Sequence, residues 1–170
     1  IFNYKYDMIR PTGSGIMGKN ENLDICRACG GRCCKKSGCD YSTEDIKDLS
    51  LSGLSNILDE GKVSITSFFA KDILPNGKKY TYPLLLLRAR NTNRDIIDLV
   101  SLKTRCAQLT ETGCIYSYED RPTGAKNLTP QADGKCYPTI DPRELVKLWI
   151  PYQKLLGRLV KKYTGLSVEE

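Results

Sequence analysis

The spacing of the cysteines is the feature that most constrains how this chain folds. Eight cysteines are present, and five of them lie within a stretch of fourteen residues. This first group reads CRACGGRCCKKSGC and contains Cys26, Cys29, Cys33, Cys34 and Cys39. A second, scattered group follows well downstream and contains Cys106, Cys114 and Cys136. The first two cysteines form a C-x₂-C pair, a spacing that lets two thiolates converge on one metal ion.

Three interpretations of these cysteines compete. Structural disulfides need an oxidising compartment, but the first ten residues lack the apolar stretch of a secretory signal, and we therefore expect a cytoplasmic protein. A bond between the neighbours Cys33 and Cys34 is also strained. Inert buried thiols have no reason to cluster. Metal ligation by thiolates therefore accounts best for the spacing, and all eight cysteines are candidate ligands.

The identity of the metal stays open between iron and zinc. Zinc prefers four tetrahedral ligands, and the pairs Cys26/Cys29 and Cys34/Cys39 resemble two zinc knuckles. An iron–sulfur cluster also takes four thiolates, often from a compact run completed by a distant cysteine. We favour a [4Fe–4S] cluster because the first group is compact and the other ligands are scattered. Eight sulfurs also suffice for two sites.

The absence of histidine excludes several kinds of chemistry. The chain has no His, so neither Ser-His nor Cys-His catalysis is available within it, and a metal must be held chiefly by sulfur. Its hydrophobic fraction of 40% fills one core at this length. The longest apolar run, Leu84–Leu87, is far too short to span a bilayer, so we expect no membrane segment.

A net charge of +6 is compatible with nucleic-acid binding, but the positions of the cations argue against it. Many basic residues flank cysteines, where they offset thiolate charge. Aromatic residues are not interleaved with them as in a nucleic-acid interface. A basic zinc module that binds nucleic acid is therefore only an alternative. The flanking cations are Arg27, Arg32, Lys35, Lys36, Lys103 and Arg105.

The remaining patterns predict an α+β fold. We expect a small single domain with short strands and hairpins, a long C-terminal helix, and irregular cysteine-rich loops around a metal site. One or two short helices follow Ser42 and end at Gly61, and Asn76-Gly77 predicts a turn between two strands. Ile96–Leu102 reads as a third strand.

Helical spacing marks the last third of the chain as one long helix. Asp141, Pro142 and Glu144 form a start signal with a capping box, Pro151 predicts a kink, and Gly165 a stop. The apolar stripe of this helix is expected to pack in the core. Residues 17–170 form the predicted metal-binding domain. Residues 1–16 are either a tag or linker, or an N-terminal extension with a strand at its start.

The two cysteine groups together resemble a known family, the YkgJ-like CxxCxxCC cysteine-cluster family, which is described as a zinc- or iron-chelating domain. The first motif, C-x₂-C-G-x-C-C, matches Cys26 to Cys34 with one extra residue. The second, C-x₂-L, a turn and then G-C-x-I-Y-x-x-R-P, matches the sequence from Cys106 to Pro122 with a shifted spacing. Many members place a further cysteine where this chain has Ala125, whereas this chain offers Cys136 later, so the resemblance leaves the identity of the last ligand open. The resemblance covers roughly residues 24–140.

The resemblance implies a metal-binding protein, because most members have no defined task beyond it. A larger relative, flagellin lysine N-methylase, carries a similar cluster, which implies a role in modifying a protein or peptide substrate. An enzyme of that kind is the main alternative. The polar residues beside Cys114 are then the first catalytic candidates: Tyr116, Tyr118, Glu119, Asp120 and Arg121. Their competing interpretation is a solvated turn. The sequence does not predict the oligomeric state.

Overall fold

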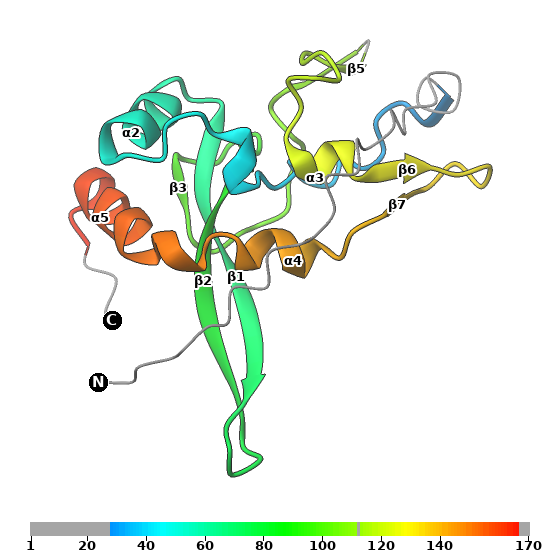
Figure 1. Ribbon diagram of the computed structural model, residues 1–170. Coiled ribbons are helices and arrows are strands. Elements are labelled where there is room, and N and C mark those ends of the chain that lie inside the picture. The colour runs from blue at the N-terminus through cyan, green and yellow to red at the C-terminus, as the bar shows by residue number, and fades with distance from the viewer. Residues whose placement is uncertain (1–27, 112, 167–170) are drawn as a thin grey trace.

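The computed structural model describes residues 28–111 and 113–166, and within them the predicted α+β fold is confirmed (Figure 1). Cys26 and the alternatives for residues 1–16 lie outside the described residues. No helix in the described part of the chain combines the length and apolar character needed to cross a membrane. The helical elements are η1 (Thr43–Asp45), α2 (Leu51–Asp59), α3 (Thr123–Lys126), α4 (Pro142–Lys147), η2 (Ile150–Tyr152) and α5 (Gln153–Thr164).

One long hairpin is the backbone of the domain. β1 (Val63–Ile73) and β2 (Lys79–Ala89) pair antiparallel along their whole length, from Val63 opposite Ala89 to Ile73 opposite Lys79. The predicted turn at Asn76-Gly77 is confirmed. Gly77 has a φ of 79°, a left-handed conformation that glycine adopts without steric cost.

The third predicted strand is much shorter than expected. Within residues 96–102, only Ile97 and Asp98 form a strand. This strand, β3 (Ile97–Asp98), pairs in parallel with β1 at Ile65 and Thr66. The chain turns directly afterwards, because the Ser101 N–H donates to the carbonyl of Asp98 and Ser101 has a φ of 53°. A local turn therefore replaces the alternating strand pattern.

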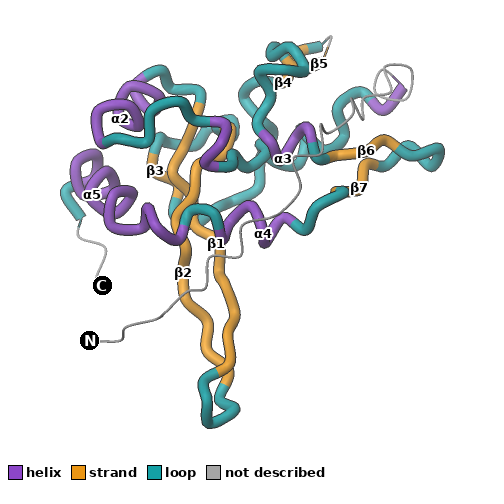
Figure 2. The backbone as a smooth tube through the Cα atoms, viewed as in Figure 1, coloured by secondary structure: helices purple, strands orange, loops and turns teal. Residues whose placement is uncertain are grey.

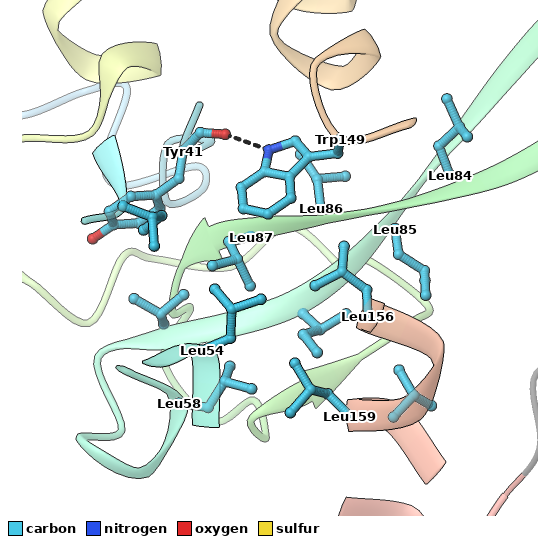
Figure 3. Packing of buried hydrophobic residues seen from close by; sticks show 14 of the residues in the cluster. Tyr41, Leu54, Leu58, Leu84, Leu85, Leu86, Leu87, Trp149, Leu156 and Leu159 are labelled. Atoms are coloured by element: carbon cyan, nitrogen blue, oxygen red, sulfur yellow. Dashed lines mark hydrogen bonds between the residues drawn. The ribbon is translucent and has the colours of Figure 1, made fainter. Parts of the chain in front are cut away.

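The inner half of the hairpin lies in the core between α2 and the C-terminal helices (Figures 1 and 3). The indole of Trp149 is fully buried and donates a 2.8 Å hydrogen bond to the backbone carbonyl of Tyr41. The predicted core role of the C-terminal stripe is thus confirmed. The fully buried side chains of the same core cluster include Leu54, Leu58, Leu86, Leu87, Leu156 and Leu159.

The predicted C-terminal helix is broken where Pro151 stands. α4 ends at Lys147, the single turn η2 contains the proline, and α5 continues to Thr164. Gly165 ends it with a left-handed φ of 71°, as predicted. The capping box is wrong: Asp141 accepts from the N–H of Arg143, while Glu144 reaches Lys147 at 2.8 Å.

The outer half of the hairpin extends beyond the core (Figure 2). Phe69 and Ile73 are each 60% exposed there. The proline of β2, Pro83, and Lys71 of β1 suit an exposed hairpin, because proline and lysine both discourage pairing with another strand. In Figure 1 this projection points away from β5 and β6.

Two small hairpins form the end of the molecule that carries the cysteines. β4 (Leu109–Thr110) pairs with β5 (Gly113–Cys114), and β6 (Leu128–Pro130) pairs with β7 (Cys136–Pro138). The predicted turn after Cys106 falls between β4 and β5. Figure 1 shows both hairpins on the same side of the sheet as the first cysteine segment.

Candidate metal centre

The first cysteine segment turns sharply at two consecutive glycines. Gly30 and Gly31 have φ values of 59° and 71°, and the N–H of Lys35 closes the following turn on the carbonyl of Gly31. A side chain at Gly31 would also collide with Leu109, because an added Cβ lies 2.7 Å from a methyl of that leucine. The segment therefore packs directly against β4, which lies between Cys106 and Cys114 of the second cysteine group.

Gly38 allows the first cysteine segment to approach β2 closely. Its backbone runs against β2, and an added Cβ would lie 1.8 Å from the carbonyl oxygen of Ala89. The close approach allows the N–H of Ala89 to donate to the carbonyl of Cys39 at 2.9 Å. The glycine thus seats Cys39 against the end of the long hairpin.

Backbone hydrogen bonds join the two cysteine groups. The N–H of Cys106 donates to the carbonyl of Cys34 at 2.7 Å. Asn91 is buried nearby, where its side-chain oxygen accepts from the N–H of Gly38 at 2.6 Å and its amide donates to the carbonyl of Leu102. These contacts fix the first group beside Cys106.

The two small hairpins carry the last two cysteines to the end of the molecule that holds the first cysteine segment. Cys114 lies on β5 opposite Leu109, and Cys136 lies on β7 opposite Pro130. Asn127 holds the start of β6 because its side chain accepts from the N–H of Ile140 at 2.7 Å and donates to the carbonyl of that residue.

The thiols of both groups interact with one another. The sulfurs of Cys33 and Cys34 are 3.9 Å apart, and the thiol of Cys136 is near enough to Cys33 to lower its pKa. Cys39, Cys106 and Cys114 interact electrostatically with this set. All seven described cysteines are free thiols, so no disulfide is present among the described residues.

The thiols differ in acidity because of these contacts. The hydrogen bond between the thiols of Cys33 and Cys34 lowers the pKa of Cys33 to about 6. The same hydrogen bond, together with burial, raises the pKa of Cys34, and burial raises the pKa of Cys39 and of Cys106. The metal-free site therefore stabilises one thiolate among neutral thiols, and a bound cation would favour more of them as thiolates.

The donor set fits a thiolate-bound metal. Tetrahedral zinc with Zn–S bonds of about 2.3 Å separates its sulfurs by about 3.8 Å, close to the 3.9 Å between Cys33 and Cys34. A complete site is not preassembled: among the described residues, no group of three or more Cys, Asp or Glu side chains is close enough to hold a metal ion. Two further thiols must move toward the pair to complete a set of four.

Cys29 lies at the edge of this region. Its sulfur accepts a hydrogen bond from the N–H of Arg32 at 3.3 Å. It lines one groove together with Cys33 and Cys136. The structure therefore places Cys29 next to the interacting thiols, while no contact with them is formed through its sulfur among the described residues.

The catalytic candidates beside Cys114 fall into two environments. Tyr116 is partly buried and interacts electrostatically with Tyr41, Cys106 and Cys114. Burial raises the pKa of both phenols.

The other candidates form an outward turn. Asp120 is exposed and accepts a 2.7 Å hydrogen bond from Ser117, and the guanidinium of Arg121 lies 5.8 Å from the ring centre of Tyr118. Glu119 is exposed in the same turn. Only Tyr116 of the five candidates is shown beside the thiols.

Sequence reasoning missed two residues of this region. Tyr41 follows Cys39 by two positions, but nothing in the local pattern indicates its contact with Tyr116. Lys135 lines the groove of Cys33 and Cys136 and directly precedes Cys136. The rule that identified Arg32 and Lys36, a cation close to a cysteine, identifies Lys135 as well when it is applied to the last cysteine.

Comparison with known proteins adds no relative to this description: no protein-family model, curated protein or solved structure matches the chain. The resemblance to the cysteine-cluster family therefore stays a prediction from the motifs. The functional argument depends on the residues themselves.

Proposed function

We propose that this protein binds a metal through cysteine thiolates, either as an iron–sulfur cluster or as zinc. The observation that carries the proposal is the meeting of thiols from segments far apart in the sequence. Cys33 interacts with Cys136, and Cys106 donates its N–H to the carbonyl of Cys34. Buried structural thiols gain nothing from such proximity, whereas metal ligands require it.

The architecture around the thiols supports the proposal. The seven described free thiols lie on turns, loops and two-stranded hairpins, and none lies on the long β1–β2 hairpin or on α2 to α5. Small hairpins of this size are marginally stable in isolation. A bound metal links such segments, because its binding free energy becomes folding free energy. Zinc would supply this stabilisation alone, and an iron–sulfur cluster would add reversible electron transfer.

Two features of the cysteines favour different metals. The compact first group with scattered further cysteines favours a [4Fe–4S] cluster, while the 3.9 Å spacing of Cys33 and Cys34 suits a single tetrahedral ion. All donors are sulfur in both cases. Thiolates stay available for either metal in a reducing compartment, and we accordingly propose a cytoplasmic location.

A role in modifying a protein or peptide extends the proposal through the resemblance to flagellin lysine N-methylase. This extension depends on Tyr116, because its phenol interacts with Tyr41 and with the thiols of Cys106 and Cys114. Tyr116→Phe removes the hydroxyl with little change in shape. Loss of activity on a lysine-containing substrate with the metal retained would support the enzyme, and unchanged activity would contradict a role for this phenol.

Anaerobic purification followed by metal analysis and visible absorption spectroscopy tests the metal proposal. An iron–sulfur cluster gives a brown protein with iron and acid-labile sulfide, and it bleaches on reduction. Zinc gives a colourless protein with stoichiometric zinc. A protein that takes up neither metal when its thiols are kept reduced would contradict the proposal.

A further inference from the structure

A groove opens beside the interacting thiols. One wall is the first cysteine segment, with Cys29 and Cys33, and the other wall is the tip of the β6–β7 hairpin, with Cys136 and Tyr137. Its volume is about 240 Å³, which is small compared with pockets for drug-sized ligands of about 300–1,000 Å³. The groove therefore suits a small ligand.

Cations dominate the walls of this groove. Arg32 and Lys36 come from the first wall and Lys135 from the second, and all three side chains are exposed. Lys135 lies 3.6 Å from Asp133, which also accepts a hydrogen bond from the hydroxyl of Tyr137. Arg32 and Lys36 have no ion-pair partner within the described residues. Among the described residues, three cations and no carboxylate line the groove, and Asp133 lies beside Lys135.

We propose that this groove binds the oxyanion of a small molecule, a carboxylate or a phosphate, on Arg32, Lys36 and Lys135. Arginine presents a fork of N–H donors that matches two oxygens of such a group, and lysine adds a point charge. Tyr137 is half exposed at the same hairpin and offers a ring and a hydroxyl beside the anion. The oxyanion end of the ligand is thereby directed to the thiols of Cys33 and Cys136.

The position of the groove links this inference to the proposed metal. A metal ion held by Cys33 and Cys136 would neutralise sulfur charge directly beneath the groove, so it should strengthen anion binding. This coupling rests on the proposed function. The anion site itself does not, because its three cations are present with or without a metal.

The competing explanation for these cations is compensation of thiolate charge. Compensation needs only nearby positive charge, and Lys35 and Arg105 also adjoin cysteines without lining the groove. It does not require cations on two opposed walls with an opening between them. The two explanations predict different losses when the cations are removed.

Titration of the full-length, reduced, metal-free protein with inorganic phosphate and with succinate tests the inference. Calorimetry measures affinity in a chloride buffer of low ionic strength, and amide NMR shifts locate the site. The test variant combines Arg32→Gln, Lys36→Gln and Lys135→Gln. The matched control, Lys71→Gln with Lys78→Gln and Lys79→Gln, removes the same charge from the projecting hairpin. The titrations are repeated with the zinc-loaded protein, and zinc affinity is measured for both variants.

We expect saturable binding of at least one probe, with shifts at Lys135 and Tyr137. The groove variant should lose about tenfold or more in affinity, because it removes all three cations that contact the oxyanion. The control variant should bind like wild type. Absence of saturable binding, or equal loss in both variants, would overturn the inference.

Failure of the inference and failure of the metal proposal give separate results. A groove variant that keeps anion affinity but loses zinc affinity assigns the cations to charge compensation and contradicts the anion site. Phosphate or succinate binding by a protein that takes up no metal supports the anion site and contradicts the metal proposal. Preference for one probe identifies the oxyanion as a phosphate or a carboxylate.

Discussion

Replacing Asn91 with alanine tests how the two cysteine groups are held together. The Asn91 side chain accepts from the buried N–H of Gly38 at 2.6 Å and donates to the carbonyl of Leu102 at 3.3 Å. Its backbone also forms a bridge with Cys106. Truncation to alanine leaves the Gly38 N–H unsatisfied between the first cysteine segment and β2.

The expected loss follows from these two contacts. A typical intramolecular hydrogen bond contributes about 1 kcal/mol, and a buried donor left without a partner costs about 1–3 kcal/mol. Asn91→Ala should therefore lower the free energy of unfolding by about 2–4 kcal/mol. Metal affinity should fall with it, because Cys39 and Cys106 lose their common support.

Denaturant unfolding of the metal-free protein measures this change as a shift in midpoint at constant slope. Asn56→Ala is the matched control: this asparagine is exposed on α2, so its removal should change stability by no more than about 0.5 kcal/mol. Equal midpoints for Asn91→Ala and Asn56→Ala would refute the reasoning.

Three further substitutions test other parts of the fold by the same unfolding measurement. Gly38→Ala should prevent or severely weaken folding, because the added Cβ meets the carbonyl of Ala89. The control Gly157→Ala adds a Cβ that meets nothing within 4 Å and should stabilise α5 by about 0.5–1 kcal/mol. Similar midpoints for the two variants would contradict the close approach of Gly38 to Ala89. Leu86→Ala should cost about 2–5 kcal/mol, while Phe69→Ser on the projecting hairpin should change stability by only about 0.5 kcal/mol. A large loss of stability in Phe69→Ser would show that the projecting hairpin packs against another part of the protein. Asp45→Ala should lower the free energy of unfolding by about 1–3 kcal/mol. The carboxylate of Asp45 accepts hydrogen bonds from the N–H of Ser42, just before η1, and from the N–H and hydroxyl of Thr123, at the start of α3. An unchanged midpoint would exclude this link between η1 and α3.

Short-range signals in the sequence predicted much of the fold. Asn76-Gly77 marks its turn through backbone conformation, and Pro151 and Gly165 mark the break and the end of the C-terminal helices. The spacing of Trp149 and Leu156 marks the core face, and both are fully buried. Each of these signals acts within a few residues, so one sequence suffices to read it.

The contacts that assemble the cysteine region act over long distances and were not predicted. Asn91 reaches Gly38 across 53 positions. Asn127 is buried by its hydrogen bonds to the segment before α4, although an asparagine in a loop ordinarily faces solvent. The sequence grouped the cysteines by chemistry, but it gave no sign that Cys136 approaches Cys33 rather than Cys106.

The metal content of paired variants tests the central claim most directly. Cys33→Ser and Cys136→Ser each replace one interacting thiol, and Ala132→Ser adds a hydroxyl to the same β6–β7 turn without removing a donor. All three are purified anaerobically, their folding is checked by circular dichroism, and bound iron, sulfide and zinc are quantified per folded chain. We expect both cysteine variants to lose most of the bound metal and Ala132→Ser to keep it. Metal retained by both cysteine variants, or absent from the wild-type protein, would contradict the account.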